Sequence, residues 1–304
     1  MTSYRAQVIK KTIRSSVKPF LSPTVPVKAQ RLISNIGLQI RMLPSETQIS
    51  SVDLDGLPAE WVLNKHTHNN ENIIIYLHGG AYNIGSPQSH RNITSRLAKA
   101  TGAMVLAIDY RLAPEHPFPA GLSDVTKAYK WLLEHGHNPK NIAISGDSAG
   151  GGLTVSSALA IKEENIELPS SLGVISPWVD LTMSGESVQS NANVDPMMRK
   201  DWLIAMGNNY ATDLRPESPL CSPIFSDLTD LPPLLIQVGS DEILLDDSVR
   251  LAQQAEASGV NVELNVWENL WHLWHFHAGF FPEADKAIQD LANHFLNHFP
   301  PASH

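Results

Sequence analysis

The sequence GDSAG at residues Gly146–Gly150 lies between two segments of opposite character. Residues 141–145 form a short, apolar-rich segment with β-branched side chains, a pattern typical of a buried strand. Residues 151–160 are rich in small side chains and are typical of a helix. A serine on such a strand-to-helix turn, with a glycine two positions to either side, matches the nucleophile elbow. We therefore identify Ser148 as a candidate nucleophile, exposed above a sheet beside the positive end of a helix.

Strand and helix patterns alternate along most of the chain. The predicted strands are 73–77, 104–108, 142–145, 172–176, 234–238 and 262–267, and the predicted helices are 89–100, 122–135, 151–164, 246–258 and 283–298. This alternation predicts an α/β fold with a mostly parallel central sheet that helices cover on both faces. Segments 48–54 and 59–64 are predicted to add antiparallel edge strands.

Two regions interrupt the alternation. Residues 1–45 precede the first strand, and residues 184–231 contain prolines, a helix candidate at 199–210 and no obvious strand. Such interruptions usually lie above the sheet. We expect residues 1–45 to form a helical cap segment and residues 46–304 to form the catalytic domain, with a cap insertion at about 184–231.

Composition limits the kinds of partner. The chain has 304 residues, 17% of them charged, and a net charge of −9, which gives no indication of a nucleic-acid partner. The single cysteine, Cys221, excludes an intramolecular disulfide and fits a reducing compartment, so we expect a cytoplasmic protein. No apolar stretch reaches the length of a membrane span, which predicts no stable membrane insertion. For the basic first helix within residues 1–20, packing on its own domain is favoured over contact with a membrane surface or a partner.

An activated serine needs a base, and the base needs an orienting carboxylate. In a fold with this elbow the acid follows the serine in the chain and the histidine comes last. Asp241 stands at the end of the predicted strand 234–238 and is the expected acid. Glu242 is expected to point the other way, and Asp246 is expected at the start of the next helix.

Three histidines follow the last predicted strand. His272 comes first and lies in a segment that could fold back over the serine, so it is the expected base. His275 is the alternative, although it and His277 stand among tryptophans and phenylalanines, where packing is the simpler explanation. A metal site built from the three is disfavoured because no carboxylate accompanies them, so we expect no metal.

The loop that follows strand 73–77 is expected to stabilise negative charge. Its sequence is His78-Gly79-Gly80-Ala81, and the backbone N–H groups of Gly79 and Gly80 are predicted oxyanion donors together with that of Ala149. His78 is expected to brace the loop. Asp147, inside the elbow, is expected to act as a hydrogen-bond brace.

Taken together, these motifs resemble those of the hormone-sensitive-lipase-like carboxylesterases, also called bacterial family IV, of the α/β-hydrolase fold. The resemblance covers residues 45–299. It implies hydrolysis of small-molecule carboxylic esters with short to medium acyl chains, no cofactor, a cap made from N-terminal helices and an insertion, and frequent homodimers. The matching stretches are 78–80, 109–115, 146–151, 176–178 and 241–244.

The chain departs from the family pattern at two points. Ala81 stands where the most familiar form has a third glycine, and His272-Leu273-Trp274 replaces the more usual His-Gly-Phe. Tyr82 and Trp178 are expected to line the substrate pocket. Residues 110–115 are interpreted as a structural turn.

These features predict a two-step acyl transfer. The alternatives are a lactone hydrolase that uses the same residues, or a non-catalytic ligand-binding protein on the hydrolase scaffold. The second is disfavoured because His272 is present.

Overall fold

One mixed sheet organises the molecule. The computed structural model describes residues 2–39, 43–65, 67, 71–212 and 214–301. Within them the strands follow the spatial order β1-β2-β4-β3-β5-β6-β7-β8. Their bounds are β1 Thr47–Asp53, β2 Pro58–Asn64, β3 Ile73–Leu77, β4 Met104–Ile108, β5 Ile142–Asp147, β6 Ser171–Ile175, β7 Leu234–Gly239 and β8 Val262–Trp267.

Helices and short 3₁₀ turns connect the strands. The helices are α1 Tyr4–Ser16, α2 Val27–Gln39, α3 Pro87–Thr101, α4 Ala120–Glu134, α5 Ala149–Glu163, α6 Ser187–Ser190, α7 Lys200–Tyr210, α8 Leu245–Ala257 and α9 Pro282–His298. The 3₁₀ turns are η1 Pro139–Asn141, η2 Pro223–Phe225 and η3 Trp274–His277. Every strand and helix predicted from the sequence is present, with bounds that differ by at most two residues, because the buried runs and amphipathic helices carry strong periodic signals.

The central strands are parallel, as predicted, and of the two edge strands only β2 runs opposite to them. The strands from β4 to β8 pair in parallel, and β2 pairs antiparallel with both β1 and β4. Because β1 is antiparallel to β2, it runs in the same direction as the central strands. In the central register Ile75 lies opposite Leu106 and Ile144.

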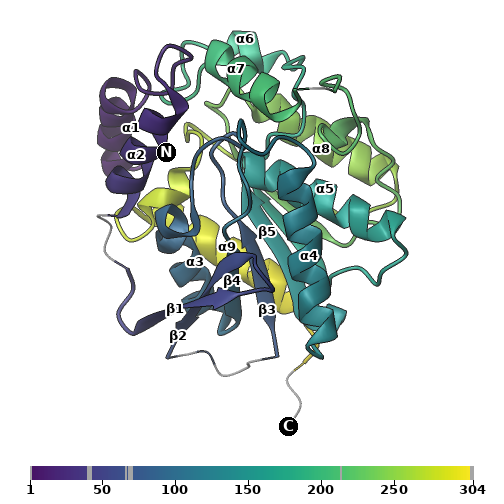
Figure 1. Ribbon diagram of the computed structural model, residues 1–304. Helices are drawn as coiled ribbons and strands as arrows, with labels where there is room; N and C mark the ends of the chain where they lie inside the picture. Colours follow the sequence, from purple (N-terminus) through teal and green to yellow (C-terminus); the bar gives the residue numbers. More distant parts are fainter. Residues whose placement is uncertain (1, 40–42, 66, 68–70, 213, 302–304) are drawn as a thin grey trace.

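Both faces of the sheet are covered, so the central strands are apolar throughout. Alternate residues of β3 enter different cores: Ile73 and Ile75 pack in the core that includes α4, α5 and α8, whereas Ile74 and Tyr76 pack with α3 and α9. Figure 1 shows α4 and α5 on one side of the strands and α3 and α9 on the other. The sheet therefore forms a middle layer between two cores, and this layer determines the positions of the loops that follow the strands.

The two interrupting regions meet beyond the carboxyl ends of the parallel strands, where Figure 1 shows α1, α2, α6 and α7. Trp202 Nε1 of α7 donates to Gln30 Oε1 of α2 at 2.8 Å. Arg14 of α1 donates to the carbonyl oxygens of Asn193 and Val194 at 2.8 and 2.7 Å. These contacts join the N-terminal helices to the segment around α6 and α7. The cap and domain boundaries proposed at residue 45 and at 184–231 stay predictions.

Helix α1 packs on its own domain, as predicted. Its residues Ala6 and Ile13 are buried. Its N-terminal end is joined to the start of α9: Glu283 accepts hydrogen bonds from the N–H and hydroxyl of Ser3, and Arg5 donates to the Phe280 carbonyl. None of the helices formed by the described residues has both the length and the apolar character needed to cross a bilayer.

The elbow glycines give the first testable prediction. A Cβ atom at Gly150 would lie 2.0 Å from the carbonyl oxygen of Leu77, whereas a Cβ at Gly207 in α7 would meet no atom closer than 3.4 Å. We expect Gly150→Ala to lower the free energy of unfolding by about 1–3 kcal/mol or more, because backbone must move. The control Gly207→Ala should change it by less than about 1 kcal/mol, since alanine favours a helix. Urea unfolding of both variants measures this, and equal stability of the two would contradict it.

Candidate active site

Ser148 occupies a strained turn between β5 and α5. Its backbone has φ 53° and ψ −119°, a conformation that side-chain-bearing residues rarely adopt. Three backbone hydrogen bonds hold it: its N–H donates to the Ile175 carbonyl at 2.8 Å, and its carbonyl accepts from the N–H groups of Trp178 and Gly152 at 2.9 and 3.0 Å. A Cβ at Gly146 would lie 2.3 Å from the Gly150 carbonyl oxygen, so the turn requires glycine there. The elbow predicted from GDSAG is confirmed.

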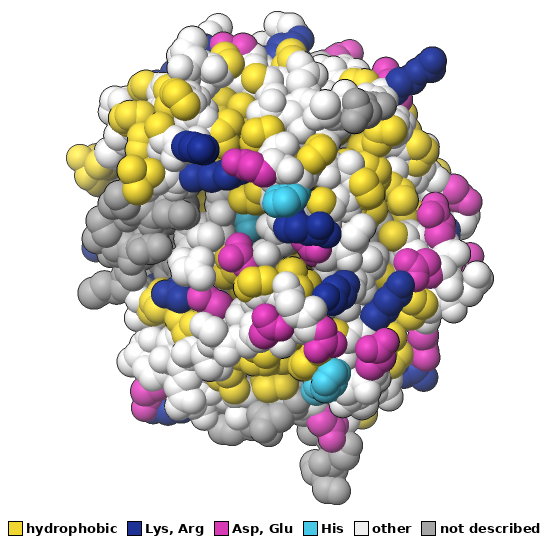
Figure 2. Space-filling view, viewed as in Figure 1, with side chains coloured by type: hydrophobic (Ala, Val, Ile, Leu, Met, Phe, Trp, Pro, Cys, Tyr) yellow, Lys and Arg dark blue, Asp and Glu magenta, His cyan; other side chains and the backbone are white. Residues whose placement is uncertain are grey.

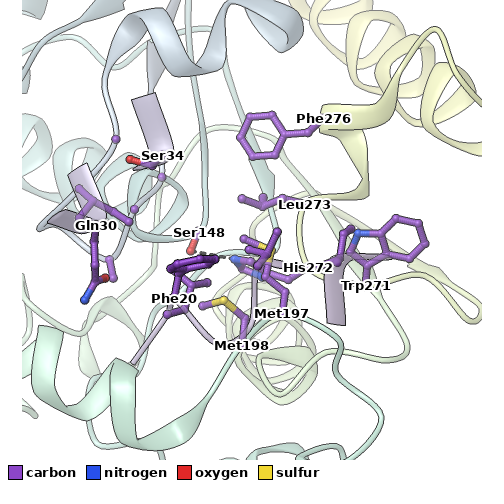
Figure 3. Close-up of a pocket in the computed structure, with 18 of the residues that line it drawn as sticks. Phe20, Gln30, Ser34, Ser148, Met197, Met198, Trp271, His272, Leu273 and Phe276 are labelled. Carbon is purple, nitrogen blue, oxygen red and sulfur yellow. Dashed lines mark hydrogen bonds between the residues drawn. The ribbon is translucent and has the colours of Figure 1, made fainter. Parts of the chain in front are cut away.

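His272 lies beside this serine. The segment after β8 folds back over the sheet and places His272 Nε2 3.0 Å from Ser148 Oγ, the interaction drawn as a dashed line in Figure 3. Both side chains are almost fully buried. The spatial pairing expected from the sequence is therefore present.

His275, the alternative, is a packing residue. Its Nε2 lies 2.9 Å from Gln237 Oε1 on β7, and burial lowers the pKa of His275 to about 3. It therefore stays neutral, and its hydrogen-bond partner is Gln237 and not Ser148.

The carboxylate that contacts His272 belongs to Glu242, and the prediction of Asp241 is wrong. Glu242 Oε2 lies 2.8 Å from His272 Nδ1. Glu242 Oε1 accepts hydrogen bonds from the Ser176 hydroxyl and the Gly239 N–H, both at 2.7 Å. Because an ionised carboxylate only accepts, Nδ1 must carry the ring proton, which leaves Nε2 able to accept a proton from Ser148.

Asp241 faces the surface instead. Its carboxylate pairs with Lys10 of α1 and accepts from the Ser240 hydroxyl. Strand β7 continues through Gly239, one residue beyond its predicted end, and the Asp241 N–H donates to the Leu270 carbonyl at 3.0 Å. The turn therefore directs residue 241 outward and residue 242 inward. The sequence does place two acids side by side at this turn. Because a glutamate side chain is long enough to reach the histidine, the pattern was compatible with either residue.

Segments above the sheet hold the acid loop in place. Asn191 Nδ2 donates to the carbonyls of Ser240 and Glu242 at 3.0 and 2.8 Å. Asp195 Oδ2 accepts from the Ile243 N–H at 2.9 Å. Asp195 Oδ1 accepts from two further N–H groups at 2.8 Å, those of Met197 and Met198, which line the cavity described below. Sequence reasoning missed Asn191 and Asp195, since only the folded chain brings them to the acid loop.

The surroundings of His272 favour its protonated form. Burial alone disfavours the imidazolium, but the charge and hydrogen bond of Glu242, with the more distant carboxylates of Asp195 and Asp147, outweigh it and raise the pKa of His272. The site therefore stabilises the positive charge that this ring would acquire on taking the Ser148 proton.

The N–H groups near Ser148 differ in part from the predicted set. The Gly79 N–H donates to His90 Nε2 of α3 at 3.3 Å, so it is already engaged and the prediction for Gly79 is wrong. The N–H groups of Gly80 and Ala81 have no hydrogen-bond partner among the residues described, and both residues line the cavity at Ser148. Ala149 is the first residue of α5 and thus has no intrahelical acceptor for its N–H. Free donors are therefore offered by Gly80, Ala81 and Ala149.

Buried polar contacts support this loop and the elbow. Asp147 accepts a hydrogen bond from the Tyr76 hydroxyl at 2.7 Å and lies 3.3 Å from His90 Nε2. His78 Nδ1 lies 2.9 Å from the Gly79 carbonyl oxygen, and burial lowers the pKa of His78 to about 3. Asp147 and His78 are braces, as predicted.

Residues 110–115 form the structural turn expected. The Tyr110 hydroxyl donates to the His78 carbonyl at 2.6 Å, and Arg111 forms an ion pair with Asp124 of α4. Glu115 pairs with Arg31 of α2.

An apolar cavity of about 500 Å³ opens at Ser148 (Figure 3). Its walls come from α1, α2 and the segment between them, the loop after β3, α7 with the loop before it, and the segment that carries His272. They include Ile9, Ile13, Phe20, Leu21, Gln30, Ile33, Ser34, Met197, Met198, Trp202, Trp271, Leu273, Phe276 and His277. Within the part of the chain that the structure describes, no group of three or more histidine, cysteine or acidic side chains is placed to bind a metal ion.

Tyr82 and Trp178 do not line this cavity, so their prediction as pocket residues is wrong. Tyr82 has a positive φ of 61°, and its buried ring packs into the core on Tyr210, with ring centroids 3.8 Å apart. The rings of Tyr82 and Trp178 are 5.7 Å apart, and Trp178 is completely buried. Nothing in the sequence shows in which direction a left-handed turn aims the ring of Tyr82.

Known proteins similar to this chain are hydrolases of one fold family. The model of the alpha/beta hydrolase fold matches residues 74–276. An acetyl-hydrolase of Streptomyces hygroscopicus is 40% identical over 269 residues, which cover 88% of this chain and 86% of the relative. An esterase of Acinetobacter venetianus is 36% identical over 294 residues, which cover 95% and 94%.

A solved structure gives the same result in three dimensions. An esterase from the bacterial hormone-sensitive lipase family superposes with a TM-score of 0.94 at 37% identity, over 99% of this chain and 100% of the other.

The two neighbouring acids can be separated by their effect on His272. Glu242→Gln removes the charge that favours the imidazolium, so the pKa of His272 should fall by about 1–3 pH units. The matched variant Asp241→Asn removes a charge that is paired with Lys10 and should leave that pKa nearly unchanged. NMR titration of protein with labelled histidine measures both. A larger fall in Asp241→Asn than in Glu242→Gln would contradict the arrangement.

Proposed function

The chain belongs to the hormone-sensitive-lipase-like branch of the α/β-hydrolase family and is a carboxylic ester hydrolase, and we propose that Ser148, His272 and Glu242 are its catalytic residues. The observation that carries the proposal is the continuous line of hydrogen bonds from Glu242 through His272 to Ser148 at the wall of an apolar cavity.

Acylation follows from this geometry. His272 Nε2 takes the hydroxyl proton while Ser148 Oγ attacks the ester carbonyl carbon, and the carbonyl oxygen becomes an oxyanion. The N–H groups of Gly80, Ala81 and Ala149 donate to that oxyanion. The tetrahedral intermediate collapses as the carbon–oxygen bond to the alcohol breaks. His272 gives its proton to the departing alkoxide, which leaves as the alcohol.

Deacylation reverses the roles with water. His272 takes a proton from a water molecule, whose oxygen attacks the acyl carbon. The second tetrahedral intermediate releases the carboxylic acid, and the proton returns to Ser148 Oγ. Throughout, the Glu242 carboxylate holds the Nδ1–H and stabilises the imidazolium.

The cavity supports short- to medium-chain esters as substrates. Its volume of about 500 Å³ falls within the range of small-molecule sites, and its walls near Ser148 carry apolar side chains such as Phe20 and Met198. An acyl chain of modest length can bury its methylenes there. The cytoplasmic location and the homodimer expected from the sequence stay predictions.

Substitution of the three residues tests the roles. Ser148→Ala should abolish turnover of a chromogenic butyrate ester and labelling by a fluorophosphonate. Glu242→Gln should lower kcat by about 10³–10⁴-fold, because the imidazole loses its orienting partner. The matched control Asp241→Asn should keep most of the activity. Equal losses in the two acid variants, or full turnover by Ser148→Ala, would refute the assignment, and absence of labelling in the unmodified enzyme would favour a non-catalytic binding protein.

Substrate length and ring closure provide a second test. Across esters of graded acyl length, kcat/KM should be highest for short to medium chains and fall for long ones that outgrow the cavity. Lactones of matching carbon number, assayed side by side, should react more slowly. Faster turnover of the lactones would identify a lactone hydrolase, and a steady rise in kcat/KM to the longest chains would contradict the proposed substrate class.

A further inference from the structure

Positive charge is concentrated in the first part of the chain. Eight of the 22 lysines and arginines, and none of the 31 acidic residues, precede residue 46. The rest of the molecule is therefore strongly acidic, although the whole chain has a net charge of only −9. Helices α1 and α2 are thus a basic element on an acidic body.

The acidic body neutralises only part of this charge. Lys10 pairs with Asp241, and Arg31 pairs with Glu115. Arg14 and Lys18 donate to backbone carbonyls and form no salt bridge with the described residues, although the charge of Lys18 also interacts with Asp195. No salt bridge is formed by Lys11 or Lys28 within the described part of the chain.

The same helices expose apolar side chains. Tyr4, Val8 and Lys11 recur at helical spacing on one stripe of α1, opposite the buried Ala6 and Ile13. Tyr4 is 80% exposed and Val8 46%.

Helix α2 repeats the pattern. Lys28 and Leu32 are four residues apart on it, and Leu32 is 62% exposed. Figure 2 shows hydrophobic side chains gathered over the region that α1 and α2 occupy in Figure 1, with basic side chains beside them. Exposed apolar residues among unpaired basic ones are typical of helices that lie in an interface.

This surface adjoins the entrance to the cavity. Phe20 and Ile33 line the cavity and are nevertheless 43% and 40% exposed, so they stand at its rim. An ester held at a surface in contact with α1 and α2 would therefore reach Ser148 along an apolar path.

We propose that the outer face of α1 and α2, defined by Tyr4, Val8, Lys11, Lys28 and Leu32, docks on an anionic lipid surface. The basic residues are attracted to the lipid headgroups, and the apolar residues enter the headgroup region without crossing the bilayer. Docking presents the cavity rim to esters dissolved in the lipid. That delivery rests on the proposed hydrolytic function, whereas docking itself does not.

Sedimentation with lipid vesicles tests docking apart from catalysis, because it can use the full-length Ser148→Ala protein. The protein should sediment with vesicles that contain phosphatidylglycerol and not with phosphatidylcholine alone. Binding should be strong at about 0.1 M salt, where the Debye length is about 10 Å, and be lost at about 1 M, where it is about 3 Å. Absence of binding to the anionic vesicles, or equal binding to both kinds, would overturn the proposal.

Variants locate the surface. Lys11→Glu/Lys28→Glu should weaken vesicle binding by about tenfold or more, since each basic residue near the surface contributes. The control Lys99→Glu/Lys140→Glu changes the net charge by the same amount at exposed sites outside α1 and α2. Lys99 lies in the last turn of α3 and Lys140 in η1, directly before β5, and this variant should bind as the parent does. Val8→Ser/Leu32→Ser should also weaken binding, and Leu296→Ser on α9, where Leu296 is 43% exposed, should not.

Folding of the variants is checked by making the same substitutions in the protein that retains Ser148. These proteins should hydrolyse a soluble acetate ester at the parental rate. Equal loss of binding in test and control variants would show that overall charge or apolarity, and not this face, drives the interaction.

Discussion

The carboxylate of Glu242 accepts hydrogen bonds from three separate segments: from Ser176 after β6, from Gly239 at the end of β7 and from His272 after β8. A buried charge is tolerated only when its oxygens are satisfied, and here all the partners come from the ends of neighbouring parallel strands. The sheet register therefore determines whether this charge is stable. The same register sets where His272 stands relative to the serine on β5.

The regions above the sheet hold the loop that carries this carboxylate. Asn191 and Asp195 bind the backbone on either side of Glu242, and Asp195 also fixes the two methionines at the cavity wall. Lys10 of α1 pairs with the neighbouring Asp241. The cavity wall at Met197 and Met198 and the carboxylate that contacts His272 are therefore parts of one hydrogen-bonded assembly. Asp195 therefore links a displacement of the cavity wall at Met197 and Met198 directly to the loop that carries Glu242.

Sequence reasoning predicted the parts of the site that depend on local pattern. Ser148 and His272 follow from an elbow motif and from chain order, and the strands that carry them have periodic signals. The acid was misassigned because strand β7 is one residue longer than its apolar run, and a single residue reverses the direction of a side chain. Gly79 was misassigned because His90, eleven residues away on α3, captures its N–H. The ring of Tyr82 was misplaced because the turn that aims it has a positive φ.

The contacts of α1 have a consequence for the order of assembly during synthesis. This helix is synthesised before its partners, because Asp241, Phe280 and Glu283 follow the residues of α1 and its N-cap that they contact by 231, 275 and 280 positions. The buried residues Ala6 and Ile13 belong to the same hydrophobic cluster as Leu291 and Phe295 of α9. A nascent chain can thus complete most of its sheet before α1 gains these contacts, and the wall that α1 contributes to the cavity is completed only afterwards.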